Sequence, residues 1–204
     1  MPTPPTPPTA TPVPPAMAHV PRLIEITSAE YAVDIDLIYA SDRNITGKPI
    51  YQAAHCLLLT PAEAGLRRAI ELAAQASLTL KIFDAYRPPE AQQALWDFLP
   101  DPTYIADISL GSNHSRGTAI DLTLVGPDGV ELDMGTGFDD MTEASAHFYP
   151  DHPANVQRNR LLLLGLMRAS GFNNIASEWW HYELPNARSF PMIVNADSGA
   201  LRLM

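Results

Sequence analysis

Two short segments carry residues that suit metal chemistry. The first reads SNHSRGTAID and contains His114 and Asp121, and the second reads SEWWH and contains Glu178 and His181. Two imidazoles and one carboxylate form a nitrogen and oxygen ligand set that suits zinc and leaves a fourth position open, as in catalytic zinc sites. A carboxylate close by that does not bind the metal, for which Glu178 is the candidate, can act as general base towards a metal-activated water.

These residues converge only with a particular local structure. His114 and Asp121 are seven positions apart, and an odd separation along one straight strand points two side chains to opposite faces. We therefore expect His114 in a loop, with Gly117 turning the chain into the strand of Asp121, because glycine accepts the backbone angles of such a turn. Glu178 must similarly lie at the bend before the strand of His181. By spacing alone the signal is weak, since a single histidine is more often structural.

An arginine forms a third candidate. Arg87 belongs to the segment DAYRP, which follows an apolar stretch at residues 78–83 and precedes a predicted helix over residues 88–99. At the mouth of a sheet an arginine can hold a fixed positive charge against a developing oxyanion. Taken alone, it is more simply a surface arginine.

The surrounding pattern predicts the elements that carry these segments. The residues Thr60 to Glu63 (TPAE) predict a helix start, with Thr60 as cap and Glu63 completing a capping box, and this helix runs to about residue 77. A second long helix is predicted over residues 155–170. Strands are predicted over residues 33–39, 78–83, 118–124, 130–132 and 179–184. Because late strands are joined by short turns, with residues 118–124 and 130–132 as a hairpin, we expect an α+β fold with a central, mostly antiparallel sheet and flanking helices.

Composition excludes several classes of protein. The chain has 204 residues with 23 acidic and 13 basic side chains, a formal net charge of −10. This balance argues against a nucleic-acid binder and against binding to an anionic membrane surface. Cys56 is the single cysteine, so there is no intrachain disulfide and no zinc site of four cysteines.

The chain divides into a tail and one domain. Residues 1–20 are rich in proline and threonine and predict a disordered or polyproline-II tail, whereas residues 21–204 have the composition of a single folded domain. The tail has neither the basic nor the leucine-rich region of a secretory signal peptide. We therefore expect the protein to be located in the cytoplasm, with the periplasm as the alternative. We also expect that a chain that begins at Met17 keeps its activity.

Together the segments SNHSRGTAID, EWWH and DAYRP resemble the motifs of the zinc D-alanyl-D-alanine dipeptidases (VanX-like). That family belongs to a wider group of zinc peptidases that includes D,D-carboxypeptidases and the hedgehog signalling domain, and the resemblance implies their fold. The segments NITGKPIY and LDMGTGFD resemble further family segments. The five motifs occur in order over nearly the whole predicted domain.

The resemblance implies a reaction and roles for its residues. The substrate would be the free dipeptide D-alanyl-D-alanine, cut into two D-alanines. Glu178 would move a proton from the attacking water to the leaving amine, and Arg87 would stabilise the tetrahedral intermediate. One zinc ion would be held by His114, Asp121 and His181.

Both ends of a free dipeptide are charged, and the resemblance implies residues for each. Asp139 would pair with the ammonium group, with the adjacent Asp140 leaving that choice open by one residue, and Tyr39 would line the same end. Ser112 would help to hold the carboxylate.

A homodimer is expected from the resemblance to the family alone. Two alternatives stay open: a D,D-carboxypeptidase acting on cell-wall peptides, and a binding domain that keeps zinc without catalysis. The sequence does not distinguish a role in glycopeptide resistance from recovery of D-alanine.

Overall fold

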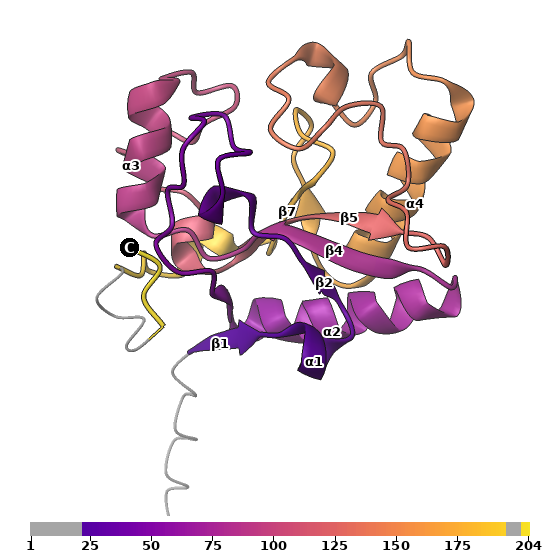
Figure 1. Ribbon diagram of the computed structural model, residues 1–204, viewed down its shortest axis with the longest axis horizontal. Helices are drawn as coiled ribbons and strands as arrows, with labels where there is room; N and C mark the ends of the chain where they lie inside the picture. Colours follow the sequence, from indigo (N-terminus) through magenta and orange to yellow (C-terminus); the bar gives the residue numbers. More distant parts are fainter. Residues whose placement is uncertain (1–21, 195–200) are drawn as a thin grey trace, which may run out of the picture.

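The central feature of the computed structural model is a five-stranded sheet crossed by helices (Figure 1). The structure describes residues 22–194 and 201–204, so the predicted tail lies outside the described residues. The strand order is β2 (Asp34–Ile35), β4 (Thr79–Asp84), β5 (Ala119–Val125), β7 (His181–Glu183) and β6 (Asn173–Asn174). Only the pair β2 and β4 is parallel among these strands, which confirms the α+β fold with a mostly antiparallel sheet.

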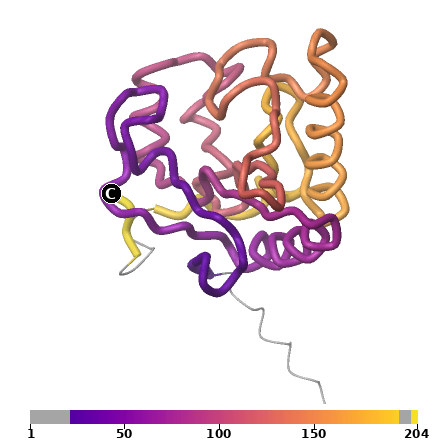
Figure 2. The backbone as a smooth tube through the Cα atoms, turned by 45° about the vertical axis from the view of Figure 1, so that its right-hand side comes forward, coloured from indigo at the N-terminus to yellow at the C-terminus, as the bar shows by residue number. Residues whose placement is uncertain are grey.

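Helices and a second small sheet surround the central one. The helices are α1 (Ser28–Tyr31), α2 (Thr60–Gln75), α3 (Pro89–Phe98) and α4 (Ala154–Ala169). The short 3₁₀ helices are η1 (Ile38–Ala40), η2 (His114–Arg116), η3 (Glu143–Ser145) and η4 (Ala187–Ser189). The strands β1 (Leu23–Ile26) and β3 (Cys56–Leu59) pair antiparallel. Figure 2 shows α2 and α4 side by side, where they contact each other, and long loops over the rest of the sheet. No described helix is long and apolar enough to cross a membrane.

The central strand β5 separates the core from the site. Its side chains alternate, and Ile120, Leu122 and Leu124 enter the large apolar cluster that also holds buried residues of α2. Asp121 and Thr123 therefore point to the opposite face. All seven residues of β5 are buried, so this second face is covered as well and can hold a polar site shielded from bulk water.

The predicted capping box of α2 is wrong. The strand β3 runs directly into this helix, so Leu59 takes the capping position and makes no side-chain cap hydrogen bond. The Thr60 hydroxyl instead donates to the backbone oxygen of Arg22, at 3.0 Å, beside β1. Glu63 accepts a hydrogen bond from the hydroxyl of Tyr31 at 2.9 Å. Both side chains thus join α2 to neighbouring segments.

The strand predicted over residues 33–39 is only partly correct. The ladder covers β2 alone, and Tyr39 lies in the 3₁₀ helix η1. The reason is that Leu37, Ile38 and Tyr39 are all buried, which a strand with one solvent-facing side does not allow. The predicted hairpin is present but short, since one bridge joins Val125 to Glu131. The helices α2, α3 and α4 agree with the predictions within a few residues at either end.

Candidate active site

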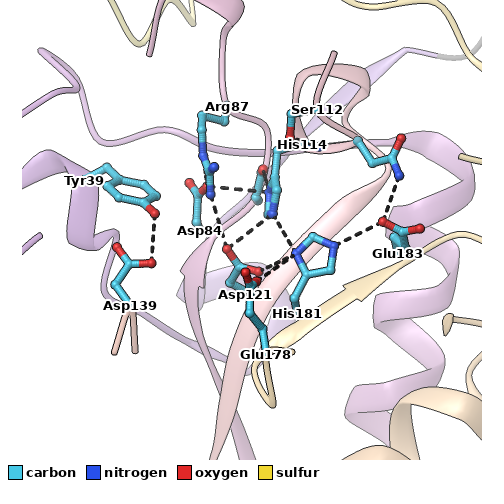
Figure 3. A network of polar contacts seen from close by, with 12 residues as sticks. Tyr39, Asp84, Arg87, Ser112, His114, Asp121, Asp139, Glu178, His181 and Glu183 are labelled. Atoms are coloured by element: carbon cyan, nitrogen blue, oxygen red, sulfur yellow. Dashed lines mark hydrogen bonds and ion pairs between the residues drawn. The ribbon is translucent and has the colours of Figure 1, made fainter. Parts of the chain in front are cut away.

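The structure brings the three predicted metal ligands together. His114 comes from η2, Asp121 from β5 and His181 from β7, and their ligand atoms all lie within 4.8 Å of one another. His114 Nε2 is 3.1 Å from His181 Nδ1 and 3.3 Å from Asp121 Oδ2. All three side chains are buried and converge on one point (Figure 3).

Local backbone structure explains this convergence. Asp121 and His181 are direct partners across the antiparallel pair of β5 and β7, so their side chains share one face. His114 lies before β5, and Gly117 turns the chain with a φ of 66°. A Cβ at Gly117 would lie 3.2 Å from the backbone nitrogen of Leu59, so glycine is required for space as well as for conformation. The turn predicted from the sequence is confirmed.

Hydrogen bonds fix which nitrogen of each imidazole is free. His114 Nδ1 is 2.7 Å from the backbone oxygen of Ala85, which only accepts, so Nδ1 carries the proton and Nε2 has a free lone pair. His181 Nε2 is 3.1 Å from a carboxylate oxygen of Glu183, and the other ring nitrogen, Nδ1, faces Asp121. Outer partners of this kind orient ligating histidines. With both imidazoles neutral, two lone pairs and a carboxylate, buried and adjacent, fit a zinc ion.

Charge within the cluster agrees with a cation site. Burial would raise the pKa of Asp121, but the imidazoles of His114 and His181 hold it below its usual value. Burial would lower the pKa of His181, but its hydrogen bonds to Asp121 and Glu183 raise it to about 10. A metal at this site therefore competes with a proton on His181.

Glu178 lies beside the cluster without joining it. It precedes β7, as expected, and its Oε2 is 4.0 Å from His181 Nδ1. The side chain is buried, and burial raises its pKa to about 8. A carboxylate with a raised pKa next to a metal site has the properties of a general base.

Arg87 lies on the other side of the cluster, with its guanidinium in fixed contacts. Its Nε donates to Asp84 at 2.9 Å and its Nη1 donates to Gln92 at 3.0 Å. Its Nη2 is 3.4 Å from Asp121 Oδ2. Arg87 is buried, so the positive charge that was expected at the mouth of the sheet is held inside, beside the proposed ligands.

The direction in which the Asp84 side chain points depends on a register change in β4 that the sequence pattern did not indicate. Plain alternation along β4 would place it on the same face as Ile82, in the apolar core. Instead the register shifts between Ile82 and Asp84, so that Asp84 pairs with Asp121 and points to the same face. There it accepts hydrogen bonds from Arg87 and from the Tyr51 hydroxyl. The only indication in the sequence that Asp84 belongs to the site was its place as the first residue of the motif DAYRP.

The predicted substrate residues line one cavity with this cluster. The cavity has a volume of about 320 Å³ and includes Tyr39, Ser112 and Asp139. The Tyr39 hydroxyl donates to Asp139 Oδ1 at 3.1 Å, whereas Asp139 Oδ2 is buried and has no hydrogen-bond partner among the residues that the structure describes. Burial raises the pKa of Asp139 to about 7. Asp140 does not line this cavity.

Sequence reasoning also missed the residues that orient His181. Glu183 accepts from His181 Nε2, and it receives a second hydrogen bond from Asn113 Nδ2 at 2.8 Å. Asn113 lies within the motif SNHSRGTAID and Glu183 lies two residues after EWWH, and these positions were the only signal for either residue.

An α+β fold with a buried pair of histidines and an aspartate, beside a free carboxylate and a guanidinium, defines a metal-dependent hydrolase. The family described as D-ala-D-ala dipeptidase matches residues 22–197, and the chain belongs to this family. It is therefore an enzyme, a zinc metallopeptidase, as the resemblance implied.

Relatives agree with this assignment over most of their length. The chain is 49% identical over 179 residues to the D-alanyl-D-alanine dipeptidase of Escherichia coli, covering 88% of this chain and 93% of the relative. It is 36% identical over 175 residues to the D-alanyl-D-alanine dipeptidase of Enterococcus faecium, covering 76% and 87%. The solved D,D-pentapeptidase VanY in complex with Zn(II) aligns with 78% of this chain and 82% of its own at 14% identity, with a TM-score of 0.44.

Proposed function

We propose that this enzyme hydrolyses the free dipeptide D-alanyl-D-alanine to two D-alanines. The relatives that it matches over most of their length are named for this activity. The observation that carries the proposal is Asp139 Oδ2, a buried carboxylate oxygen that no described residue contacts by a hydrogen bond, in the cavity that also holds the His114, Asp121 and His181 cluster. A buried acceptor of this kind is costly unless a ligand supplies the donor, and a substrate ammonium group does so.

We assign the metal to three ligands: His114 through Nε2, Asp121 through its carboxylate and His181 through Nδ1. When bound, zinc polarises a carbonyl oxygen and lowers the pKa of water. The two outer partners, Ala85 and Glu183, keep the imidazoles in the tautomers that this requires.

Glu178 supplies the proton transfers in this proposal. Its Oε2 accepts a proton from the attacking water and later donates it to the nitrogen of the leaving D-alanine. Burial favours this role because it raises the pKa of Glu178 towards the pH at which the enzyme transfers the proton. The 4.0 Å separation from His181 Nδ1 places it close to the metal site but outside the ligand set.

Arg87 stabilises the negative charge that develops on the substrate carbonyl oxygen. Asp84 and Gln92 already hold the guanidinium on two sides, so the charge needs little reorganisation during the reaction. Burial strengthens the effect since water does not screen it.

The ends of the substrate determine selectivity. Asp139, supported by Tyr39, binds the ammonium group, and Ser112 contributes to the carboxylate end. A substrate with a blocked amino group leaves Asp139 without its counter-charge in a buried position, and this penalty excludes longer peptides.

The test compares hydrolysis of free D-Ala-D-Ala with hydrolysis of a pentapeptide that ends in D-Ala-D-Ala. We expect a kcat/KM for the dipeptide at least about 100-fold higher, because the lost ion pair is a charge-assisted hydrogen bond in a buried site. Equal or greater activity on the pentapeptide would instead assign a D,D-carboxypeptidase.

A further inference from the structure

The segment that carries Asp139 has little regular structure of its own. We call residues 132–147 the Asp139 loop; it runs from the turn after β5 through η3. Apart from η3 it has no helix or strand, so its shape depends on contacts with other elements. Those contacts decide where the Asp139 carboxylate lies.

Arg160 of α4 binds this loop at three points. Its Nε donates to the backbone oxygen of Met134 at 2.7 Å, before Asp139 in the chain. Its Nη1 and Nη2 donate to the backbone oxygens of Ala146 at 2.6 Å and Ala144 at 2.9 Å, after Asp139. One rigid guanidinium thus joins the two ends of the loop.

The burial of Arg160 is unusual for a charged residue. The side chain is 1% exposed, and within residues 22–194 and 201–204 no ion pair is formed by it. Burial lowers its pKa to about 10, so it stays protonated at neutral pH. A cation buried against neutral groups is costly to place, and the carbonyl oxygens that accept its hydrogen bonds are at least partly buried and need donors in turn. This indicates a specific role for the arrangement.

A second set of contacts ties the loop to the segment of Glu178. Trp179 Nε1 donates to Thr136 Oγ1 at 2.8 Å. The hydroxyl oxygens of Thr136 and Ser145 are 3.0 Å apart, and Thr136 is the donor because the single hydroxyl hydrogen of Ser145 is used elsewhere. The Ser145 hydroxyl then donates to the backbone oxygen of Asp140 at 2.5 Å. The Arg160 guanidinium lies 6.0 Å from the ring centroid of the same Trp179. The loop is therefore held between α4 and the segment that leads into β7.

The backbone of Asp139 shows that these contacts are needed. Asp139 has a φ of 59°, in the left-handed region that favours glycine. Such a conformation is strained for a residue with a side chain, and it persists where the surroundings enforce it.

We propose that Arg160 is a positioning residue for recognition of the substrate ammonium: it holds the Asp139 loop closed so that the Asp139 carboxylate faces the cavity. This inference rests on the proposed function, in which Asp139 binds the ammonium group. Arg160 acts through the loop and touches neither substrate nor metal ligand.

The test replaces Arg160 by Met, which keeps the length of the side chain and removes the donors. We expect R160M to raise KM for D-Ala-D-Ala about 10-fold or more, with kcat within about 3-fold and metal content unchanged. Amide hydrogen exchange in the Asp139 loop accelerates in this variant. The matched control is R158M, which removes an exposed arginine from the same helix and leaves all these values unchanged. R160K, which cannot reach three separate carbonyls from one nitrogen, should lie between wild type and R160M.

A double-mutant cycle separates this inference from the proposed function. If Arg160 acts through Asp139, then R160M has no further effect on KM in the D139N background. If D139N itself leaves KM unchanged, the ammonium role of Asp139 is wrong. If D139N raises KM but R160M does not, or if R160M lowers kcat and metal content together, the positioning role of Arg160 is wrong.

A second variant keeps the inference testable if R160M folds poorly. T136V removes the hydroxyl that connects Trp179 with Ser145 and preserves the shape of the side chain. We expect a KM increase of about 3-fold at unchanged kcat and metal content, since one neutral hydrogen-bonded link is lost. An unchanged KM in T136V, together with normal exchange in the Asp139 loop, would count against the loop anchoring.

Discussion

Replacement of Glu178 by Gln separates proton transfer from metal binding. Glutamine keeps the size of the side chain and can accept a hydrogen bond, but it cannot carry the proton from water to the leaving amine. Because Glu178 lies outside the ligand cluster of His114, Asp121 and His181, the metal should remain bound. We expect one zinc per chain in E178Q, as in the unchanged enzyme.

The expected loss follows from the surroundings of Glu178. Removal of a general base usually lowers kcat by about 10²–10⁴-fold, which corresponds to about 3–5.5 kcal/mol in activation free energy. Glu178 is only 7% exposed, so bulk water reaches the site poorly as a substitute base. We therefore expect the upper half of that range, about 10³–10⁴-fold, with KM changed by less than about 3-fold.

The assay measures D-alanine release at saturating D-Ala-D-Ala, with zinc determined on the same sample. The control is E71Q, an exposed carboxylate of α2 that should change neither quantity. If E178Q loses zinc along with activity, Glu178 is a ligand rather than a base. If E178Q keeps zinc and more than about a tenth of kcat, another group moves the proton and the assignment is wrong.

Three further predictions concern the other residues of the site. Replacement of Arg87 by Lys should lower kcat about 10²–10³-fold with zinc retained. One ammonium group cannot keep the contacts to Asp84 and Gln92 while it faces the oxyanion. Steady-state kinetics and metal analysis of the variant check this. E183Q should weaken zinc binding about 10–100-fold, as measured by competition with a chelator, because His181 loses its anionic outer partner. The Asp139 carboxyl, with its pKa raised by burial to about 7, is protonated below that pH and then offers no charge to the ammonium, so KM should rise as the pH falls from 7 to 6. D139N should remove this dependence, and a KM that is independent of pH in the unchanged enzyme would contradict the assignment.

Much of the site could be predicted because its residues lie in short local motifs. The turn at Gly117, and the positions of His114 before β5 and Glu178 before β7, follow from side-chain alternation and from the conformational freedom of glycine. The helices α2, α3 and α4 were predictable for the same reason, since their periodicity and flanking prolines are local.

Other features depend on distant contacts and escaped prediction. Thr60 was expected to cap α2, but β1 lies close enough to take its hydroxyl. Tyr39 was expected in a strand, but burial of three consecutive side chains moves it into η1, from which it reaches Asp139. In each case a tertiary contact outweighs the local preference, which amounts to a fraction of a kcal/mol per residue.

The sequence by itself marked the residues to which we assign the chemistry: the proposed metal ligands, Glu178 and Arg87 are chemically distinctive and lie in ordered motifs. Only the tertiary structure decided how they are held. The register shift that turns Asp84 towards Asp121, the proton position that Ala85 sets on His114, and the anchoring of the Asp139 loop by Arg160 all join segments far apart in the chain. Most of these contacts are hydrogen bonds to backbone carbonyls or pairings between strands, which any residue type can offer, so no sequence pattern marks them.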